Sequence, residues 1–323
     1  MARVLIVLDG GYRFSEATGI PDFTYTVLAD ALASAGHQVT KAHRQTDGSA
    51  DIQSFNFATS GNLLDHDVIW LIGFEGRNST TATGTSGAGI GETELAAIAR
   101  FMEAGGGVFA TGDHDSIGAE MCGRIPRVRA MRCWYGANDG ASPMPADFPR
   151  NFPPLTPGRA DTTRQNPLGD YDLNDDGTDE AFVWFENQSD SVPHTIAPTT
   201  SPAHSILRRG GGDITVYPDH MHEGNTLGVV GGYDYTQALT LDGQAFSEFP
   251  AIAGHREMPE VVATGQTVAF ASRYAHDNSF LDTAIPDPKT INTLSAYDGR
   301  VAGVGRVVTG ATFHVGDGRM FVR

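Results

Sequence analysis

Cysteine is almost absent from the sequence. Only Cys122 and Cys133 occur among 323 residues. Two cysteines are too few for a disulfide framework and are typical of a reducing compartment, although a single local disulfide between them remains an alternative. Long apolar runs are missing too: nowhere do roughly 18 apolar residues follow one another, so we expect no membrane-spanning helix. The N-terminal run Val4–Leu8 is too short for a signal peptide and stops at Asp9. We therefore expect a cytoplasmic protein.

Basic residues are also scarce. The chain has 22 Lys and Arg residues against 39 Asp and Glu residues, a formal net charge of −17 at pH 7. Such a surface repels phosphate backbones and anionic lipids, so nucleic acid and membranes are poor partners. The glycine runs at 10–11 and 105–107 match no phosphate-loop or dinucleotide fingerprint, so nothing supports a nucleotide cofactor. A small-molecule substrate is the expected partner, and homo-oligomerisation is left open.

Short apolar, β-branched runs bounded by turn residues are what the sequence does contain. The first four are separated by segments long enough for crossover helices, which indicates a parallel sheet. Apolar residues at helical spacing over 23–33, before Gly36, and the acidic start at Glu92 ahead of Leu95–Met102 predict two such helices. The expected strands are Val4–Leu8, Gln38–Lys41, Val68–Ile72, Val108–Ala110, Ile214–Tyr217, Val268–Ala271 and Val307–Val308, the last continuing to Phe313.

Residues 136–204 do not continue this alternation of expected strands and helices. They are dense in Pro, Asp and Asn and hold one apolar run, Ala181–Phe185. We expect an irregular, loop-rich insertion packed on the same core, so that residues 1–323 form a single α/β domain with a mostly parallel open sheet. A second irregular stretch, residues 77–91, is rich in Ser, Thr and Gly, and such long loops inside compact domains are usually mobile or functional.

Polar side chains follow almost every expected strand. Ligands of open parallel sheets bind at the carboxyl ends of the strands, so we expect these side chains to converge on one edge of the sheet. There they would supply acid–base groups and substrate contacts. The candidate catalytic residues are Asp113, His114, Glu223, His276 and His314, and the candidate substrate-binding residues are Asp9, Glu75, Arg273 and Asn278.

His220 and His222 form the sharpest local pattern. Two imidazoles one residue apart on an extended segment point to the same side, so they can hold one metal ion, with Glu223 as ligand or general base. We expect His114 as a third ligand, and zinc, iron or manganese would suit these donors. Two alternatives stay open: the histidines cap backbone groups in a polar turn, or they act as acid and base without any ion.

A weaker metal pattern lies in the insertion. Asp172, Asn174 and Asp176 alternate as in the first half of a calcium-binding loop, followed by Gly177. The twelfth position, which should be a bidentate Glu, is Val183. A solvated acidic turn therefore competes with calcium binding.

The turn Gly112-Asp113-His114-Asp115 leads from an expected strand into a helix that begins near Ser116 and runs through Cys122. Asp113 there is either a general base or a helix N-cap, and we expect both cysteines to be packing groups rather than nucleophiles. Beyond it lies a basic cluster, which either pairs with the acidic insertion or clamps a substrate carboxylate. The cluster consists of Arg124, Arg127, Arg129 and Arg132.

Three segments, His66–Gly73, Phe101–Ala110 and Gly305–His314, together with the order of elements, resemble the class I glutamine amidotransferase-like superfamily, particularly its trehalose-utilisation (ThuA-like) branch. The resemblance is clear over residues 1–125 and loose over the last third. It implies a three-layer flavodoxin-like architecture. The Cys-His-Glu triad of the amidotransferases does not carry over, because Gly112-Asp113-His114 stands where the family has its elbow cysteine. Glutaminase chemistry is therefore not expected.

The sequence thus predicts a hydrolase of a small polar substrate, metal-assisted or using histidine acid–base chemistry. The alternative is a non-catalytic small-molecule or sugar-binding protein of the ThuA-like family, distinguished by tight binding without turnover. A structural or assembly component is a third reading, and an amidase with a cysteine nucleophile ranks last.

Overall fold

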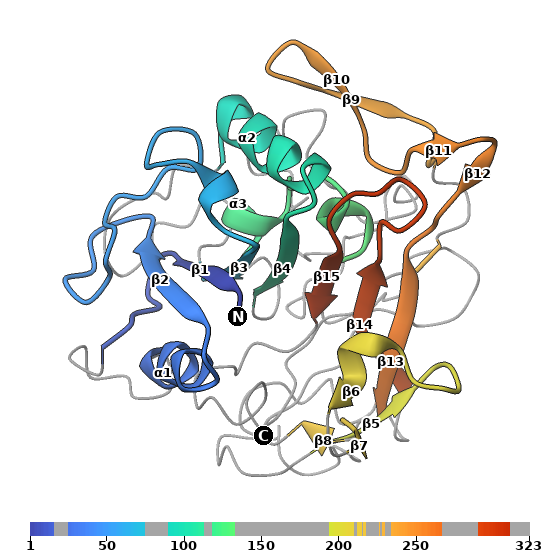
Figure 1. Cartoon of the computed structure of the whole chain (residues 1–323), viewed down its shortest axis with the longest axis horizontal. Coiled ribbons are helices and arrows are strands. Elements are labelled where there is room, and N and C mark those ends of the chain that lie inside the picture. The colour runs from blue at the N-terminus through green and yellow to red at the C-terminus, as the bar shows by residue number, and fades with distance from the viewer. Residues whose placement is uncertain are drawn as a thin grey trace, which may run out of the picture.

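Figure 1 shows the computed structural model of the chain. The structure describes residues 1–15, 25–74, 90–112, 118–132, 194–209, 212–214, 216–217, 226, 228–229, 234–266 and 290–310. Its main element is a sheet of nine strands. In chain order these are β1 (Arg3–Leu8), β2 (Gln38–His43), β3 (Val68–Gly73), β4 (Gly107–Gly112), β5 (His194–Pro198), β8 (Val216–Tyr217), β13 (Glu260–Gln266), β14 (Thr290–Tyr297) and β15 (Val307–Gly310).

The first half of the sheet is parallel, in the order β2-β1-β3-β4-β15. β1, β3 and β4 are buried on both faces, as expected where helices cover a parallel sheet, whereas the edge strand β2 is partly exposed. Ile6 is in register with Trp70, and Trp70 with Phe109, so these side chains share one face. Leu5 and Ile69 alternate with them on the other face.

The second half is antiparallel, and continues from β15 as β14-β13-β5-β8. Because each of these pairs is antiparallel, β14 and β5 run opposite to the other seven strands of the nine. The sheet is therefore mixed. The carboxyl ends of β13 and β8 nevertheless point to the same edge as those of β1, β3, β4 and β15.

The helices that the structure describes lie on both sides of the parallel half (Figure 1). α2 (Glu92–Glu103) and the short α3 (Ala119–Cys122) pack on one face, where Leu95, Ile98 and Met102 join the core with Leu5 and Ile69. α1 (Thr26–Ser34) lies on the opposite side and buries Leu28, Ala29 and Leu32. None of these helices is long and apolar enough to cross a membrane.

Smaller elements complete the described chain. Two hairpins, β9 (Ala238–Leu241) with β10 (Gln244–Ser247) and β11 (Ala251–Ile252) with β12 (His255–Arg256), form an arm that projects on the α2 side (Figure 1). A third pair joins β6 (Arg208–Arg209) to β7 (Gly212–Asp213). Single 3-10 turns are η3 (Leu63–Asp65), η4 (Val128–Ala130) and η5 (Ser205–Leu207).

A buried arginine connects the arm to the core. Arg127 is fully buried between the rings of Phe246 and Tyr297, with its guanidinium carbon 5.1 and 5.2 Å from the ring centroids. Its backbone N–H donates to Glu248 Oε1 at 2.7 Å, and its Nη2 donates to Glu103 at 2.6 Å. These contacts join the arm to α2 and β14.

The α/β class, the first four strands and the two expected helices are confirmed, with bounds shifted by up to three residues. The structure adds β13, β14 and β5, which the sequence did not predict as strands. β5 lies inside the expected insertion 136–204 and yet belongs to the main sheet. Residues 136–193 of that insertion and the expected strand Val268–Ala271 lie outside the described residues.

Candidate functional site at the carboxyl edge

Four neighbouring parallel strands end at one edge of the sheet. β1, β3, β4 and β15 are adjacent, and their last residues are followed by Asp9, Phe74, Asp113 and Ala311. In parallel strands spaced about 4.8 Å apart, these four ends lie within about 15 Å of one another. The predicted convergence of strand ends is thus confirmed for this part of the sheet, which we call the carboxyl edge.

Asp9 links the ends of β1 and β3. Its side chain is buried, with 2% of the residue exposed, and Oδ1 accepts a hydrogen bond from the backbone N–H of Phe74 at 2.5 Å. The Phe74 ring stands edge-on to Tyr12 with a centroid distance of 4.9 Å. The predicted substrate-binding Asp9 therefore also has a structural contact, which fixes the point where the chain leaves β3.

Two glycines allow the turn after β4 to return to the edge. A Cβ atom on Gly73, the last residue of β3, would lie 2.6 Å from the Cα of Gly118. Gly118 itself has φ of +98°, a conformation that side-chain-bearing residues rarely adopt. The chain around Gly112-Asp113-His114 is thus bounded by Gly112 on β4 and by Gly118 packed on β3.

Arg132 joins the ends of β4 and β15. It is almost fully buried, and its Nη1 donates to the Gly310 carbonyl at 2.6 Å and to Thr111 Oγ1 at 3.1 Å. Its Nη2 donates to the Gly112 carbonyl at 2.9 Å. Because charged donors make strong hydrogen bonds in a buried setting, this side chain fixes both strand ends.

Thr226 reaches the same place from a different part of the chain. It is fully buried and forms an isolated antiparallel bridge with Arg132. Its N–H donates to the carbonyl of Asn292, at the end of β14 that lies on the carboxyl edge. The segment that contains His220, His222 and Glu223 therefore ends beside Arg132.

Cys122 lies beneath the edge and is a packing group, as the sequence predicts. It is completely buried, with Sγ 3.5 Å from the Thr111 carbonyl. Burial raises the pKa of its thiol far above the usual range, Asp9 raises it further, and Arg132 opposes this only in part. A thiol with a strongly raised pKa is a poor nucleophile.

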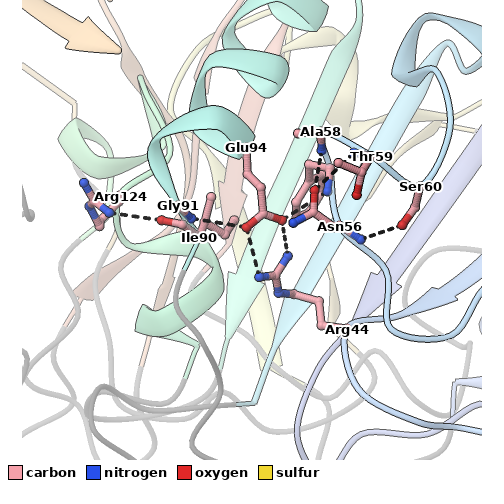
Figure 2. A network of polar contacts seen from close by, with 10 residues as sticks. Arg44, Asn56, Ala58, Thr59, Ser60, Ile90, Gly91, Glu94 and Arg124 are labelled. Atoms are coloured by element: carbon pink, nitrogen blue, oxygen red, sulfur yellow. Dashed lines mark hydrogen bonds and ion pairs between the residues drawn. The ribbon is translucent and has the colours of Figure 1, made fainter. Parts of the chain in front are cut away.

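A second polar network fixes the flank of the edge (Figure 2). Arg44, which follows β2, forms an ion pair with Glu94 in the first turn of α2, with Nη1 and Oε1 2.6 Å apart. Glu94 also accepts hydrogen bonds from the N–H groups of Phe57 and Gly91. Burial opposes ionisation of Glu94, but these donors, Arg44 first among them, lower its pKa.

The same network fixes the start of α2 from the other side. Arg124 Nη1 donates to the Ile90 carbonyl at 3.0 Å, and its Nη2 pairs with Glu92 at 2.5 Å. Asp9 fixes Phe74, so the two residues that flank the Ser/Thr/Gly-rich segment 75–89 both have defined positions at this edge. The segment itself, which includes the predicted Glu75, lies outside the described residues.

The basic cluster forms ion pairs, as expected, but with acids outside the insertion. Arg124 pairs with Glu92, Arg127 with Glu103, and Arg129 with Glu248 at 3.2 Å. The acid partners that the structure gives thus belong to α2 and the arm rather than to residues 136–204. Arg132 donates to the carbonyls of Gly112 and Gly310 and to Thr111 Oγ1.

Most of the predicted site residues lie outside the described part of the chain. Within that part, no three histidine, cysteine or carboxylate side chains are grouped to hold a metal ion. The metal, catalytic and calcium assignments therefore stay predictions. The residues concerned are Asp113, His114, His220, His222, Glu223, His276, His314, Glu75, Arg273, Asn278, Asp172, Asn174 and Asp176, and Cys133 is likewise outside.

Sequence reasoning missed the anchoring roles of Thr111, Arg132 and Thr226. An arginine directly after the apolar pair Ala130-Met131 was the available signal for a buried guanidinium. No such signal marks Thr226, because its position depends on long-range contacts with Arg132 and Asn292.

No protein-family model matches the chain, and no curated protein matches it at a significant level.

Proposed function

We propose that the carboxyl edge is the active site of a hydrolase that acts on a small polar substrate. The observation that carries the proposal is the convergence at Arg132. This residue contacts the last residues of β4 and β15 and bridges to Thr226. Three chain segments that contain histidine and carboxylate residues therefore begin or end at one buried residue, two at the guanidinium of Arg132 and one at its backbone.

The maximum length of the intervening chain supports this grouping of the candidate residues. An extended chain spans at most about 3.6 Å per residue, so His114, two residues after Gly112, lies within about 7 Å of it. By the same limit Glu223 lies within about 11 Å of Thr226, and His314 within about 14 Å of Gly310. His276, Arg273 and Asn278 follow β13, which ends on the same edge two strands beyond β15.

The proposed chemistry follows from these side chains. His220, His222 and His114 hold a divalent metal or transfer protons, and Glu223 or Asp113 is the general base. A zinc, iron or manganese ion held there would lower the pKa of water toward neutrality. Asp9 positions the chain after β3, and Arg273 and Asn278 bind the polar substrate. Cys122 takes no part, because its thiol is buried and its pKa is raised.

We include in the same proposal the three-layer flavodoxin-like arrangement of the fold. The parallel order β2-β1-β3-β4-β15 matches the flavodoxin-like order 2-1-3-4-5. α1 and α2 lie on opposite sides of the sheet, which a three-layer arrangement requires. Both observations support the resemblance to the glutamine amidotransferase-like superfamily and its ThuA-like branch. Fold likeness does not fix the reaction, so the hydrolase proposal depends on the edge residues alone.

The test begins with elemental analysis of protein purified without a metal-binding tag. We expect near-stoichiometric zinc, iron or manganese that disappears in the double variant His220→Ala/His222→Ala. The matched control is His255→Ala, an exposed histidine on β12, which should keep the metal.

Turnover is then measured on a panel of small esters, amides and lactones. The single variant His222→Ala should lose hydrolysis while its circular dichroism spectrum stays unchanged, whether or not a metal is found. Full activity in this variant would contradict the proposal. Tight binding of a polar ligand without any turnover would favour the alternative, a small-molecule or sugar-binding protein.

A further inference from the structure

The face of the sheet opposite α2 carries a groove that the proposed active site does not use. The groove has a volume of about 490 Å³ and lies over β3, β4, β15 and β14. Val68 and Gly107, the first residues of β3 and β4, line it, so it lies toward the amino ends of the parallel strands. It is thus a separate site, at the end of the strands away from the carboxyl edge.

The base of the groove is apolar. Trp70, Phe109 and Val308 lie in one row across three strands, because the strands pair in register there. The Trp70 and Phe109 rings meet edge to face with centroids 5.5 Å apart. Leu294 on β14 and Ile206 on η5 complete the apolar lining. Such a surface favours a ligand with a flat or aliphatic apolar body.

The rim of the groove is positive, in contrast to the acidic chain. Arg300 and Arg306 both line it, and the carboxylate that they share is Asp298, whose side chain is 8% exposed. Arg306 Nε lies 2.6 Å from Asp298 Oδ1, and Arg300 also pairs with Asp298. Two guanidiniums against one carboxylate leave one net positive charge at the rim, in a chain of net charge −17.

The two guanidiniums keep donors for a ligand. Arg300 is 69% exposed and uses Nη2 for Asp298, while Arg306 uses Nε for Asp298 and Nη2 for Ser205 Oγ. His204 lies behind Asp298, with Nε2 3.3 Å from Oδ1, and also faces the exposed Glu260 at 3.7 Å. Glu260 is not part of the groove lining, and its side chain is 55% exposed, so solvent screens its charge from the rim.

We propose that this groove binds a small amphiphilic carboxylate, with its apolar body on Trp70, Phe109 and Val308 and its carboxylate on Arg300 and Arg306. A guanidinium binds a carboxylate through paired hydrogen bonds, which suits this head group. The volume is typical of small-ligand pockets, whereas a protein partner would need roughly 800 Å² of surface on each side. The inference does not depend on the hydrolase proposal, because no residue is shared.

The test uses three probes of one shape and different charge: 2-naphthoate, 2-naphthalenemethanol and 2-naphthylmethylammonium. Equilibrium dialysis of the full chain measures the Kd of each. We expect naphthoate to bind about tenfold more tightly than the alcohol and the cation to bind most weakly, since a charge-assisted hydrogen bond at an exposed rim is worth about one decade. The preference for naphthoate should shrink with added salt.

Variants locate the binding. Arg300→Gln, at an exposed position, should weaken naphthoate about five- to tenfold and leave the alcohol within about twofold. Arg3→Gln is the matched control, because Arg3 also forms a partly exposed ion pair, with Asp67 at 2.8 Å. Val308→Trp fills the groove and should abolish binding of all three probes, with thermal melting as the check on folding.

Three results would overturn the proposal. One is that no probe binds to the wild-type chain, which would mean that the groove is closed to ligands. Another is equal affinity for naphthoate and the alcohol together with no effect of Arg300→Gln. The last is wild-type binding by a folded Val308→Trp variant, which would place the probes elsewhere on the molecule.

Discussion

The thiol of Cys122 shows that burial can make a potentially nucleophilic side chain unreactive. It lies among the carbonyls of β3 and β4, and burial together with Asp9 raises its pKa. We predict that iodoacetamide at pH 8 does not alkylate Cys122 in the folded chain and does so after unfolding in urea. Peptide mass spectrometry separates it from Cys133. Rapid labelling of Cys122 in the native protein would contradict this and would reopen the cysteine-nucleophile hypothesis.

His43 makes stability depend on pH. It is fully buried, its Nδ1 accepts the N–H of Gln45 at 2.9 Å, and Nε2 lies 2.9 Å from the Tyr12 carbonyl. Burial lowers its pKa, and the nearby Arg13 lowers it further. Between the lowered folded pKa and about 6.5, the unfolded chain therefore binds more protons than the folded one.

The free energy of unfolding should consequently fall as the pH drops from about 7 to 5. Urea titrations across this range measure the slope, and the carboxylates contribute only at lower pH. His43→Gln should flatten the slope, while His255→Gln, at an exposed position, should leave it unchanged. His66, whose pKa burial also lowers, should contribute to the slope that remains. An identical slope in wild type and His43→Gln would refute the assignment.

At the scale of elements, Glu94 holds the amino end of α2 against the loop after β2. Its side chain is 6% exposed and that of its partner Arg44 is 10% exposed. We predict that Glu94→Gln lowers the free energy of unfolding by about 2–3 kcal/mol, because Arg44 would keep a buried charge without its carboxylate. Chemical denaturation measures the loss.

Glu92→Gln is the control for this prediction. Glu92 pairs with Arg124 from the same helical turn, but its side chain is 50% exposed, so the expected loss is under about 1 kcal/mol. Equal losses in the free energy of unfolding of the two variants would mean that burial of the Arg44–Glu94 pair does not increase its contribution to stability.

The arm formed by β9 to β12 depends on Glu248 in the same way. This side chain is 2% exposed and accepts hydrogen bonds from the Arg127 backbone and from Arg129 Nε. Glu248→Ala should cost about 3–5 kcal/mol and should release the arm, since the buried Arg129 guanidinium loses this carboxylate and the buried backbone N–H of Arg127 loses its acceptor. Limited proteolysis should then cut within residues 234–258, whereas Asp30→Asn on the exposed side of α1 should be as resistant as the wild type.

For the whole molecule, one core joins distant parts of the sequence. Leu5 and Ile69 of the parallel half belong to the same buried cluster as Leu239 and Phe249 of the arm and Tyr297 of β14. We therefore predict a single cooperative unfolding transition, as for one domain. Near- and far-ultraviolet circular dichroism should give coincident denaturation curves. Two separated transitions would mean that the arm and the second half of the sheet form a unit of their own.

The sequence predicted the parallel half of this molecule well and the antiparallel half poorly, for a physical reason. Strands β1, β3 and β4 are buried on both faces, so they appear as continuous apolar runs between helices. β14 instead buries Thr293 and Ser295 completely. Polar residues inside a strand remove the apolar pattern, and the antiparallel pairing with β13 cannot be read from either sequence alone.

The candidate site was predictable only in outline. The rule that polar residues gather at strand ends placed Asp9 correctly and identified the edge. The rule could not reveal that Arg132 would join two strand ends, or that Thr226 would bridge to it, because these contacts depend on residues about 90 to 180 positions apart in the chain. The His220/His222 pair stays a prediction.

Arg132 has a further consequence for how this chain tolerates change. Its main contacts are the carbonyl oxygens of Gly112 and Gly310, and every amino acid supplies the same oxygen. These two hydrogen bonds at the carboxyl edge therefore do not depend on which side chains follow in the next segments. A change of composition in those segments would therefore leave these two hydrogen bonds in place and keep the ends of β4 and β15 in register.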